Sequence, residues 1–231
     1  MSKILFLIPA RGGSKEIPHK NIKILGNKPL INYSIEFARK FADDADICVS
    51  TDDDKIIKVV SESNLKIPFQ RPENISTDFS TTDEVIEHAL NYYKSKGINY
   101  DIVVLIQPTS PFREEQDLMN MLNEFNESID IIASVCIPKS NPYFTLFEEN
   151  KQHLLVRCKK SNSTRRQDAE KVYAFNGSIY IINAKTFRID NLSKKKIKKY
   201  LMQDPIYSID IDEELDWLLA ETILNKKNNT L

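Results

Sequence analysis

Short apolar runs alternate with amphipathic segments along this chain, and no other feature of the sequence constrains the fold as strongly. The runs are continuous and only a few residues long, which is typical of strands buried on both faces of a parallel sheet. The expected strands cover residues 4–8, 47–50, 102–106, 129–137, 178–182 and 206–211. The expected helices cover residues 30–41, 53–63, 81–96, 114–125 and 213–224. Thr81 and Glu84 form a capping-box pattern at the third helix start. This alternation predicts an α/β fold with a mostly parallel sheet.

Composition sets the size of the protein and the kinds of partner it can bind. The chain has 231 residues, 41% of them hydrophobic, with 32 basic against 33 acidic side chains. That length suits one globular domain, which we expect to span residues 1–231. A net charge near zero argues against nucleic-acid binding, which usually goes with a basic excess. The densest basic run, residues 194–199, is interpreted as a solvated helix face or loop without a function of its own.

Cysteine usage and the N-terminal residues indicate a cytoplasmic protein. Cys48, Cys136 and Cys158 are widely separated, which favours buried thiols in a reducing compartment over disulfides or a zinc site. The apolar stretch before Arg11 is too short for a signal peptide or a membrane span. We therefore expect a soluble cytoplasmic protein.

Residues 139–172 differ in composition from the rest of the chain. They are polar, carry turn signals at Asn141-Pro142 and at residues 148–150, and contain short alternating stretches at residues 143–147 and 153–158. This pattern predicts a β-hairpin that leaves the main sheet rather than a separate domain.

A basic loop with a glycine pair follows the first expected strand. Residues 8–25 read IPARGGSKEIPHKNIKIL. Gly12 and Gly13 allow a close backbone approach to a ligand, and Arg11, Lys15 and Lys20 can neutralise phosphate oxygens. The loop matches neither the Walker pattern nor G-x-G-x-x-G. It is either a polyphosphate-binding loop or an ordinary strand-to-helix turn with solvated lysines, and residues elsewhere in the chain favour the first.

Two carboxylates stand near the end of the last expected strand, in the segment SIDIDEELDW. Asp210 and Asp212 alternate on that strand, so both would leave one face at the sheet edge where α/β proteins bind ligands. Such a pair can hold Mg²⁺ together with substrate phosphates. The alternative is that Asp212 caps the following helix and Asp210 is solvated.

Five further positions carry candidate polar contacts. Gln107, directly after a buried strand, can hydrogen-bond a polyhydroxylated substrate or simply belong to a turn. Arg71 and Thr82 can contact a base and a ribose, with a surface salt bridge as the competing account of the arginine. Arg165 and Arg166 suit bidentate binding of a carboxylate. The alternative is that both belong to a solvated loop.

Taken together, seven segments in order along nearly the whole chain carry a family resemblance: IPARGGSKEIPHKNIKILGNKPLINYSI, STDDDKI, RPENISTDFSTTDEVIEHAL, LIQPTSPFR, RRQD, FNGSIYI and IDIDEELDWLLAE. The chain resembles the bacterial N-acylneuraminate cytidylyltransferases. The resemblance implies a Rossmann-like nucleotidyltransferase fold and a homodimer formed through an inserted β-hairpin dimerisation region at residues 139–172. It also implies transfer of CMP from CTP to a 3-deoxy-nonulosonic acid, an acidic nine-carbon sugar, with Mg²⁺.

The same resemblance implies roles for individual residues. Nucleotide contacts fall on Arg11, Gly12, Gly13, Lys15, Lys20, Asn21, Arg71 and Thr82. Sugar contacts fall on Gln107, Arg165, Arg166 and Tyr180, one of the two arginines reaching the sugar carboxylate across the dimer. Metal binding falls on Asp210 and Asp212. The catalytic set is Lys20, Arg11 and Asp212, the last lying near the attacking hydroxyl.

Two departures from the family pattern bear on the substrate. Glu16 stands where the first loop commonly has glycine, which adds a carboxylate beside the phosphates. Residues 141–144 read Asn-Pro-Tyr-Phe where sialic acid enzymes often have His-Pro-Leu-Lys. Because Phe144 cannot replace an ammonium group, a related sugar such as legionaminic acid competes with N-acetylneuraminate. A Kdo-type cytidylyltransferase and a catalytically silent nucleotide-binding module are the remaining alternatives.

Overall fold

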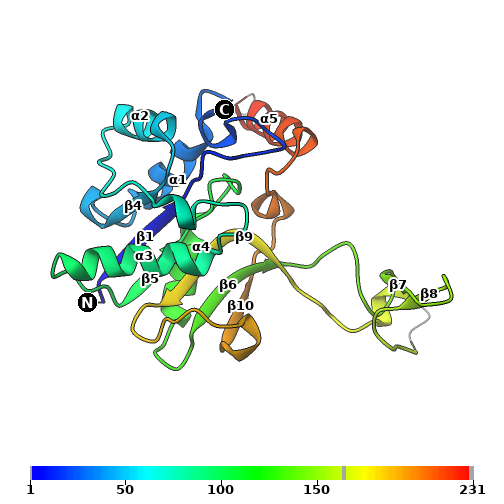
Figure 1. The fold of residues 1–231 in the computed structure, drawn as a ribbon. Helices are drawn as coiled ribbons and strands as arrows, with labels where there is room; N and C mark the ends of the chain where they lie inside the picture. The colour runs from blue at the N-terminus through cyan, green and yellow to red at the C-terminus, as the bar shows by residue number, and fades with distance from the viewer. Residues whose placement is uncertain (1, 163–164, 229–231) are drawn as a thin grey trace.

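A six-stranded sheet runs through the centre of the molecule (Figure 1). The computed structural model describes residues 2–162 and 165–228. The sheet order is β10-β6-β9-β5-β1-β4. Its strands are β1 (Ile4–Pro9), β4 (Ile47–Ser50), β5 (Ile102–Leu105), β6 (Ile131–Cys136), β9 (Ala174–Asn183) and β10 (Ile197–Leu201). A minor two-stranded sheet pairs β2 (Ile24–Leu25) with β3 (Lys28–Pro29).

Strand directions confirm the predicted mostly parallel sheet. β1 pairs in parallel with β4 and β5, and β6 pairs in parallel with β10. β9 runs antiparallel to both of its neighbours, β5 and β6. The carboxyl ends of β1 and β5 therefore meet at one edge, where polar loops follow both strands.

Five α-helices accompany the sheet in the part of the chain that the structure describes. They are α1 (Leu30–Ala38), α2 (Asp54–Glu62), α3 (Thr82–Ser95), α4 (Glu115–Glu124) and α5 (Glu214–Asn228). The predicted capping box is confirmed at α3: the Glu84 N–H donates to Thr81 Oγ1 at 3.3 Å, and the Thr81 N–H donates to Glu84 Oε2 at 2.6 Å. Reciprocal bonds of this kind satisfy backbone donors that the first turn leaves free.

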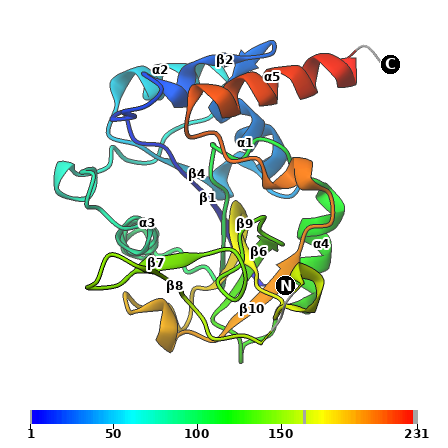
Figure 2. The ribbon, with the colours of Figure 1, turned by 90° about the vertical axis from the view of Figure 1, so that its right-hand side faces the viewer.

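The sheet is buried on both faces, as the continuous apolar runs predict. In β1, Phe6 and Ile8 pack toward α1, α2 and α4, while Leu5 and Leu7 pack toward α3. Figure 2 shows α3 on one side of the strands and α1 and α4 on the other. All four of these β1 side chains are at most 1% exposed. A central strand covered on both sides holds its terminal loop rigidly.

One sequence prediction about the last third of the chain is wrong, and another holds only in part. Residues 206–211 do not form a strand. Instead η6 (Pro205–Ser208) is a 3-10 turn, which Asp204 starts by accepting the Ile206 N–H at 2.9 Å. In the basic run at 194–199, Lys194 ends the 3-10 turn η5 (Leu192–Lys194) and two loop residues follow, but residues from Ile197 onward form edge strand β10. Lysines are common on edge strands, where their charge discourages further strand pairing.

The expected excursion at residues 139–172 contains a short antiparallel strand pair. β7 (Phe147–Glu149) pairs antiparallel with β8 (Leu155–Arg157). Figure 1 shows this pair projecting away from the central sheet on two long connections. Its apolar side chains are exposed, including Phe147 and Leu155.

The cysteines match their prediction in part. All three are free thiols, but only Cys48 is buried, whereas Cys136 and Cys158 are partly exposed. Among the helices that the structure describes, none is long and apolar enough to cross a membrane.

Candidate functional site

A cavity of about 540 Å³ lies beyond the carboxyl ends of β1 and β5. This is the edge of the sheet at which α/β proteins bind their ligands. Nine residues singled out from the sequence line it: Arg11, Lys15, Lys20, Asn21, Arg71, Thr82, Gln107, Asp210 and Asp212. Glu16, the departure from the family pattern, lines it too. The structure thus brings together side chains from widely separated segments of the chain.

Arg11 and Lys15 converge on one carboxylate. Arg11 Nη1 and Lys15 Nζ each lie 2.5 Å from an oxygen of Asp78. Hydrogen bonds from both cations lower the pKa of Asp78, and the bond from Lys15 has the larger effect. Sequence reasoning missed Asp78, because only the fold brings residue 78 to this loop. The contact shows that the two cations can hold a single anionic group between them.

The first glycine of the pair is required by packing within the protein. A Cβ on Gly12 would lie 2.3 Å from Asp53 Oδ2, and the Gly12 N–H donates to Asp52 Oδ1 at 3.2 Å. The close approach of this loop to the start of α2 therefore needs glycine at position 12. Gly13 has open space around it, and neither glycine is among the described residues that line the cavity.

Lys20 links the first loop to the acidic segment. It begins η1 (Lys20–Ile22), and its Nζ donates to the Ile211 carbonyl at 2.7 Å and to Asp212 Oδ1 at 3.0 Å. The Lys20 side chain is 12% exposed and that of Asp212 is 73% exposed. Asn21 is buried, and its side-chain amide donates to the Arg11 carbonyl at 3.1 Å. This bond ties the two ends of the loop between Arg11 and Lys20 together.

Asp210 and Asp212 line the cavity without belonging to a strand, which corrects the geometry expected from the sequence. The segment is held instead by the Ile211 N–H, which donates to the Thr109 carbonyl at 2.8 Å. Burial raises the pKa of Asp210, a hydrogen bond from Thr109 opposes this, and the charge of Asp212 raises it further. The two carboxylates are therefore close enough to repel each other.

The alternative role for Asp212 as a helix cap is wrong. Asp216 Oδ2 accepts the Asp212 and Glu213 N–H groups at 3.0 and 2.9 Å, so Asp216 caps this end of α5. The carboxylate of Asp212 faces Lys20 instead.

The donor set at the carboxylate pair fits a hard divalent cation that is completed by substrate. Two carboxylates with like-charge repulsion favour a cation between them. Over the described ranges 2–162 and 165–228, no group of three or more His, Cys, Asp or Glu side chains forms a closed metal site. Mg²⁺ commonly takes one or two carboxylates and fills its remaining positions with phosphates and water.

Arg71 is a buried residue, so the surface salt bridge considered for it is wrong. Its exposed fraction is 5%. Its Nε donates to Ser50 Oγ at 3.0 Å, a second guanidinium nitrogen donates to the Ser50 carbonyl, and its backbone N–H donates to the Thr51 carbonyl at 2.7 Å. Burial lowers the pKa of Arg71. The side chain is thus fixed at the end of β4 on the cavity wall.

Gly177 is a site residue that sequence reasoning did not assign. Its φ is +72°, and an added Cβ would lie 2.7 Å from Gln107 Oε1, 3.0 Å from Ser110 Oγ and 3.3 Å from Asp210 Oδ2. Only glycine allows these groups to meet over β9. The Asn-Gly pair at 176–177 signalled a turn, but nothing local connected it with Gln107.

Arg113 binds the backbone next to Gly177 and Gln107. Its Nε donates to the Ser178 carbonyl at 3.0 Å, its Nη1 donates to Ser34 Oγ at 3.2 Å, and its Nη2 donates to the Gln107 carbonyl. Burial lowers the pKa of Arg113 to about 9, and the charge of Asp210 opposes that shift. The guanidinium therefore joins α1, β9 and the loop after β5.

Two predicted sugar contacts lie away from the main cavity. Tyr180 lines a neighbouring cavity of about 170 Å³ that shares Thr82 and Gln107 with it. Arg165 is exposed on the excursion, where its Nε lies 2.7 Å from Asp168 Oδ2, and it is not among the described residues that line the main cavity. Arg166 begins η4 (Arg166–Asp168), but its side chain lies outside the part of the chain that the structure describes.

The fold and the cavity together define an α/β nucleotidyltransferase. The solved structure of CMP:2-keto-3-deoxy-manno-octonic acid synthetase, determined in complex with CTP, matches this fold with a TM-score of 0.73. The two chains are 15% identical, and the match covers 98% of this chain and 100% of the other. At this identity the likeness shows the shared fold.

Sequence comparison then gives the family. A family profile described as Cytidylyltransferase matches residues 5–229, so the chain belongs to the cytidylyltransferase family. CMP-N,N'-diacetyllegionaminic acid synthase from Legionella pneumophila is 31% identical over 231 residues, covering 99% of each chain. Pseudaminic acid cytidylyltransferase from Campylobacter jejuni is 31% identical over 229 residues, covering 98% of each chain. The family resemblance noted in the sequence is confirmed.

Proposed function

We propose that this protein transfers CMP from CTP to the anomeric hydroxyl of a 3-deoxy-nonulosonic acid, forming the CMP-activated sugar and pyrophosphate. The observation that carries the proposal is the single cavity that unites the cationic loop, Gln107 and the pair Asp210 and Asp212. Membership of the cytidylyltransferase family supports the reaction class. The two relatives named for diacetyllegionaminic and pseudaminic acids support the class of sugar.

Arg11 and Lys15 are assigned to the triphosphate. They already converge on the Asp78 carboxylate, and a phosphate group is a stronger anion for the same two cations. Arg71 and Thr82 are assigned to the cytidine, because both line the same cavity. Asn21 holds the backbone that carries Arg11.

Phosphoryl-group transfer depends mainly on positioning and on neutralising charge. The anomeric oxygen attacks the α-phosphorus, the bond from that phosphorus to the pyrophosphate oxygen breaks, and the hydroxyl loses its proton. Lys20, which reaches the acidic segment, stabilises charge on the phosphate. Asp212, the more exposed carboxylate, orients the hydroxyl. Asp210 and Asp212 would hold Mg²⁺, which when bound neutralises phosphate charge.

The sugar is assigned to the side of the cavity formed by Gln107 and Tyr180. Both residues line the smaller cavity, which shares Thr82 and Gln107 with the larger one. For the sugar carboxylate, we assign Arg165 or Arg166 of a second chain, because Arg165 is exposed on the projecting excursion. The exposed apolar side chains of β7 and β8 support a homodimer formed there. We propose that this homodimer acts in the cytoplasm.

The aromatic Phe144 favours a substrate other than N-acetylneuraminate. Arg157 stacks over the Phe144 ring, with the guanidinium carbon 5.9 Å from the ring centroid. The position therefore supplies an apolar surface where an ammonium group would bind a polar sugar substituent. Legionaminic acid or a close relative is the substrate we favour.

Pyrophosphate release tests the proposal directly. CTP and Mg²⁺ are supplied with N-acetylneuraminate, legionaminate, pseudaminate or Kdo in parallel reactions. Release with a nonulosonic acid is expected and identifies the sugar. Release with Kdo alone would favour the Kdo-type enzyme, and CTP binding without release from any of the four would favour a catalytically silent module.

A further inference from the structure

A partly buried ion pair lies outside both cavities, between α3 and the segment that leads into β10. Lys195 Nζ is 2.5 Å from Asp83 Oδ2, and the two residues are 112 positions apart in the sequence. The Lys195 side chain is 8% exposed and that of Asp83 is 24% exposed. Lys195 Nζ also lies 5.2 Å from the centroid of the Phe187 ring. Because an unpaired buried ammonium is costly, this contact holds the two segments together.

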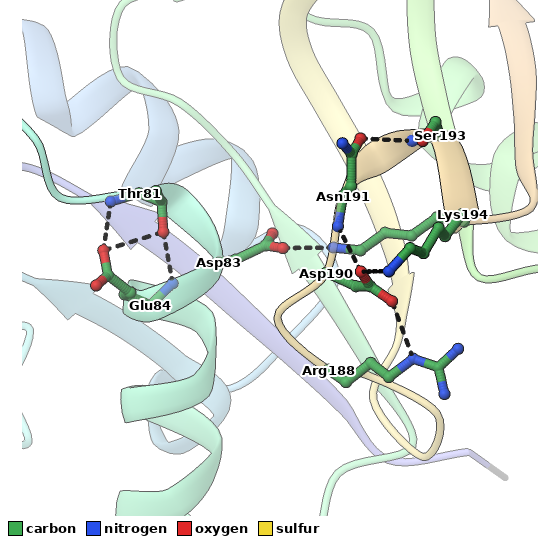
Figure 3. A network of polar contacts seen from close by, with 9 residues as sticks. Thr81, Asp83, Glu84, Arg188, Asp190, Asn191, Ser193 and Lys194 are labelled. Atoms are coloured by element: carbon green, nitrogen blue, oxygen red, sulfur yellow. Dashed lines mark hydrogen bonds and ion pairs between the residues drawn. The ribbon is translucent and has the colours of Figure 1, made fainter.

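Asp83 belongs to the first turn of α3, and that turn forms part of the nucleotide cavity. Ser80, Thr81 and Thr82 line the cavity immediately before it. Thr82 lines the smaller cavity as well. Figure 3 shows the capping box of Thr81 and Glu84 beside Asp83 at the same helix start. One turn of helix therefore presents residues to the cavity and is anchored through Asp83.

The capping box and the ion pair do different work. The bonds between Thr81 and Glu84 are internal to the helix start, so they favour the helical conformation of the turn. They do not fix where that turn lies relative to the sheet. The contact between Asp83 and Lys195 does, because its two partners come from different parts of the fold.

Hydrogen bonds hold the segment that carries Lys195. In Figure 3, the Asp190 carboxylate accepts the Asn191 N–H at 2.8 Å and Lys194 Nζ at 2.9 Å. One residue after Lys195, the Lys196 N–H donates to Asp130 Oδ2 at 2.8 Å, beside the first residue of β6. Lys195 is therefore tied to the central sheet on one side and to its own turn on the other.

We propose that Lys195 is a positioning residue for nucleotide binding, which acts through Asp83 to fix the first turn of α3 on the cavity wall. The identity of the nucleotide as CTP rests on the function proposed above. Lys195 contacts neither cavity, so its loss leaves the reacting groups in place. Loss of Lys195 lowers the fraction of molecules in which the first turn of α3 is placed to bind CTP. The apparent affinity for CTP falls in proportion to that fraction.

The test compares two neighbouring lysines. Lys195→Met keeps the aliphatic stem and removes the charge, and Lys194→Met makes the same change where the ammonium binds Asp190 within its own turn. We expect Lys195→Met to weaken CTP binding in calorimetry and to raise the KM for CTP about tenfold, with kcat within about twofold of the wild type. Lys194→Met is expected to match the wild type in all three quantities.

A double variant keeps the test decisive if Lys195→Met does not fold. Asp83→Asn with Lys195→Met leaves no unpaired charge at the contact. It is expected to show about the same loss of CTP affinity as Lys195→Met alone, because the two residues act as one pair. Wild-type affinity in the folded double variant would overturn the proposal, as would an equal fall in kcat and affinity in Lys195→Met.

Direct binding separates this proposal from the function on which it rests. If the wild-type protein does not bind CTP, the proposed function fails. If the wild type binds CTP and Lys195→Met binds it equally well, only the role of Lys195 fails.

Discussion

Lys20 Nζ donates a hydrogen bond to Asp212 Oδ1 at 3.0 Å across 192 positions of sequence. This contact joins the loop after the first strand to the acidic segment before the last helix. The same ammonium also donates to the Ile211 carbonyl. In the proposed function, a cation held against the acidic segment in this way neutralises phosphate charge.

Replacing Lys20 is expected to abolish most of the activity. Lys20→Met should lower kcat for pyrophosphate release at least about a hundredfold, the usual effect of removing one electrostatic contact to a transition state. Lys23→Met is the matched control, because Lys23 pairs with Glu214 on the outside of the same turn. Near wild-type turnover in Lys20→Met would contradict the assignment of Lys20.

The carboxylate pair predicts a linked pH effect. Burial, reinforced by the charge of Asp212, raises the pKa of Asp210, and metal binding requires the ionised form. Activity should therefore fall with decreasing pH already above the ordinary aspartate range. A conservative change at Asp212 removes the neighbouring charge, so the residual activity of Asp212→Asn should titrate at lower pH than the wild type. A pH profile of kcat/KM for both proteins checks this, and identical acid limbs would contradict the coupling.

The raised pKa of Asp210 predicts that its carboxylate supports activity but does not stabilise the fold at neutral pH. Its folded-state pKa is raised, so folding favours the protonated form, and this stabilising contribution is lost as pH rises from the ordinary aspartate pKa through the raised one. Asp210→Asn should therefore be at least as stable as the wild type at neutral pH while losing activity. Thermal unfolding at pH 7 is the measurement. A large fall in melting temperature would show that the carboxylate supports the fold instead.

Glycine at position 177 is expected to be irreplaceable. Gly177→Ala adds a Cβ that meets Gln107 and Asp210 at a positive φ, which should destabilise the protein by about 1–3 kcal/mol and lower activity. Gly13→Ala is the control, because an added Cβ there meets nothing within 4 Å. Urea unfolding compares the two. Equal stability of both variants would mean that the close contacts at Gly177 are not maintained in solution.

The proposed sharing of a site between two chains can be tested by mixing inactive variants. Asp212→Asn lacks the acidic group of the cavity, and the double change Arg165→Ala with Arg166→Ala lacks the groups on the excursion. If an arginine acts across a dimer, subunit exchange should restore about one quarter of the wild-type activity. No recovery after verified exchange would assign the arginines to their own chain or to no role.

The sequence predicts best what depends on local pattern. The run ICVS matches strand β4 residue for residue, and the TTDE segment gives the capping box of α3. Both signals depend on neighbouring residues alone. Strand β10 was missed because lysines dominate its local pattern, and its pairing with β6 is decided by the sheet edge. Residues 206–211 do not form the expected strand, because Asp204 and Pro205 begin a 3-10 turn there.

The candidate site was predictable where side-chain chemistry alone pointed to a ligand. Cations, carboxylates, an amide and a hydroxyl suggested eight of the nine predicted residues that line the cavity, and the family resemblance added Asn21. Supporting contacts were not predictable, because Asp78, Arg113 and Gly177 act on partners more distant than any local pattern reaches. Gln107 meets Arg113 within one loop, but nothing in the sequence shows that a guanidinium holds its carbonyl.

Product analysis tests the central claim most directly. Wild-type protein is incubated with CTP, Mg²⁺ and legionaminate, and the mixture is followed by ³¹P NMR and mass spectrometry. The account predicts a CMP–sugar phosphodiester and pyrophosphate in equal amounts, and far less of both products with Asp212→Asn over the same time. CTP that stays intact with every nonulosonic acid, or that is hydrolysed without forming a sugar ester, would contradict the account.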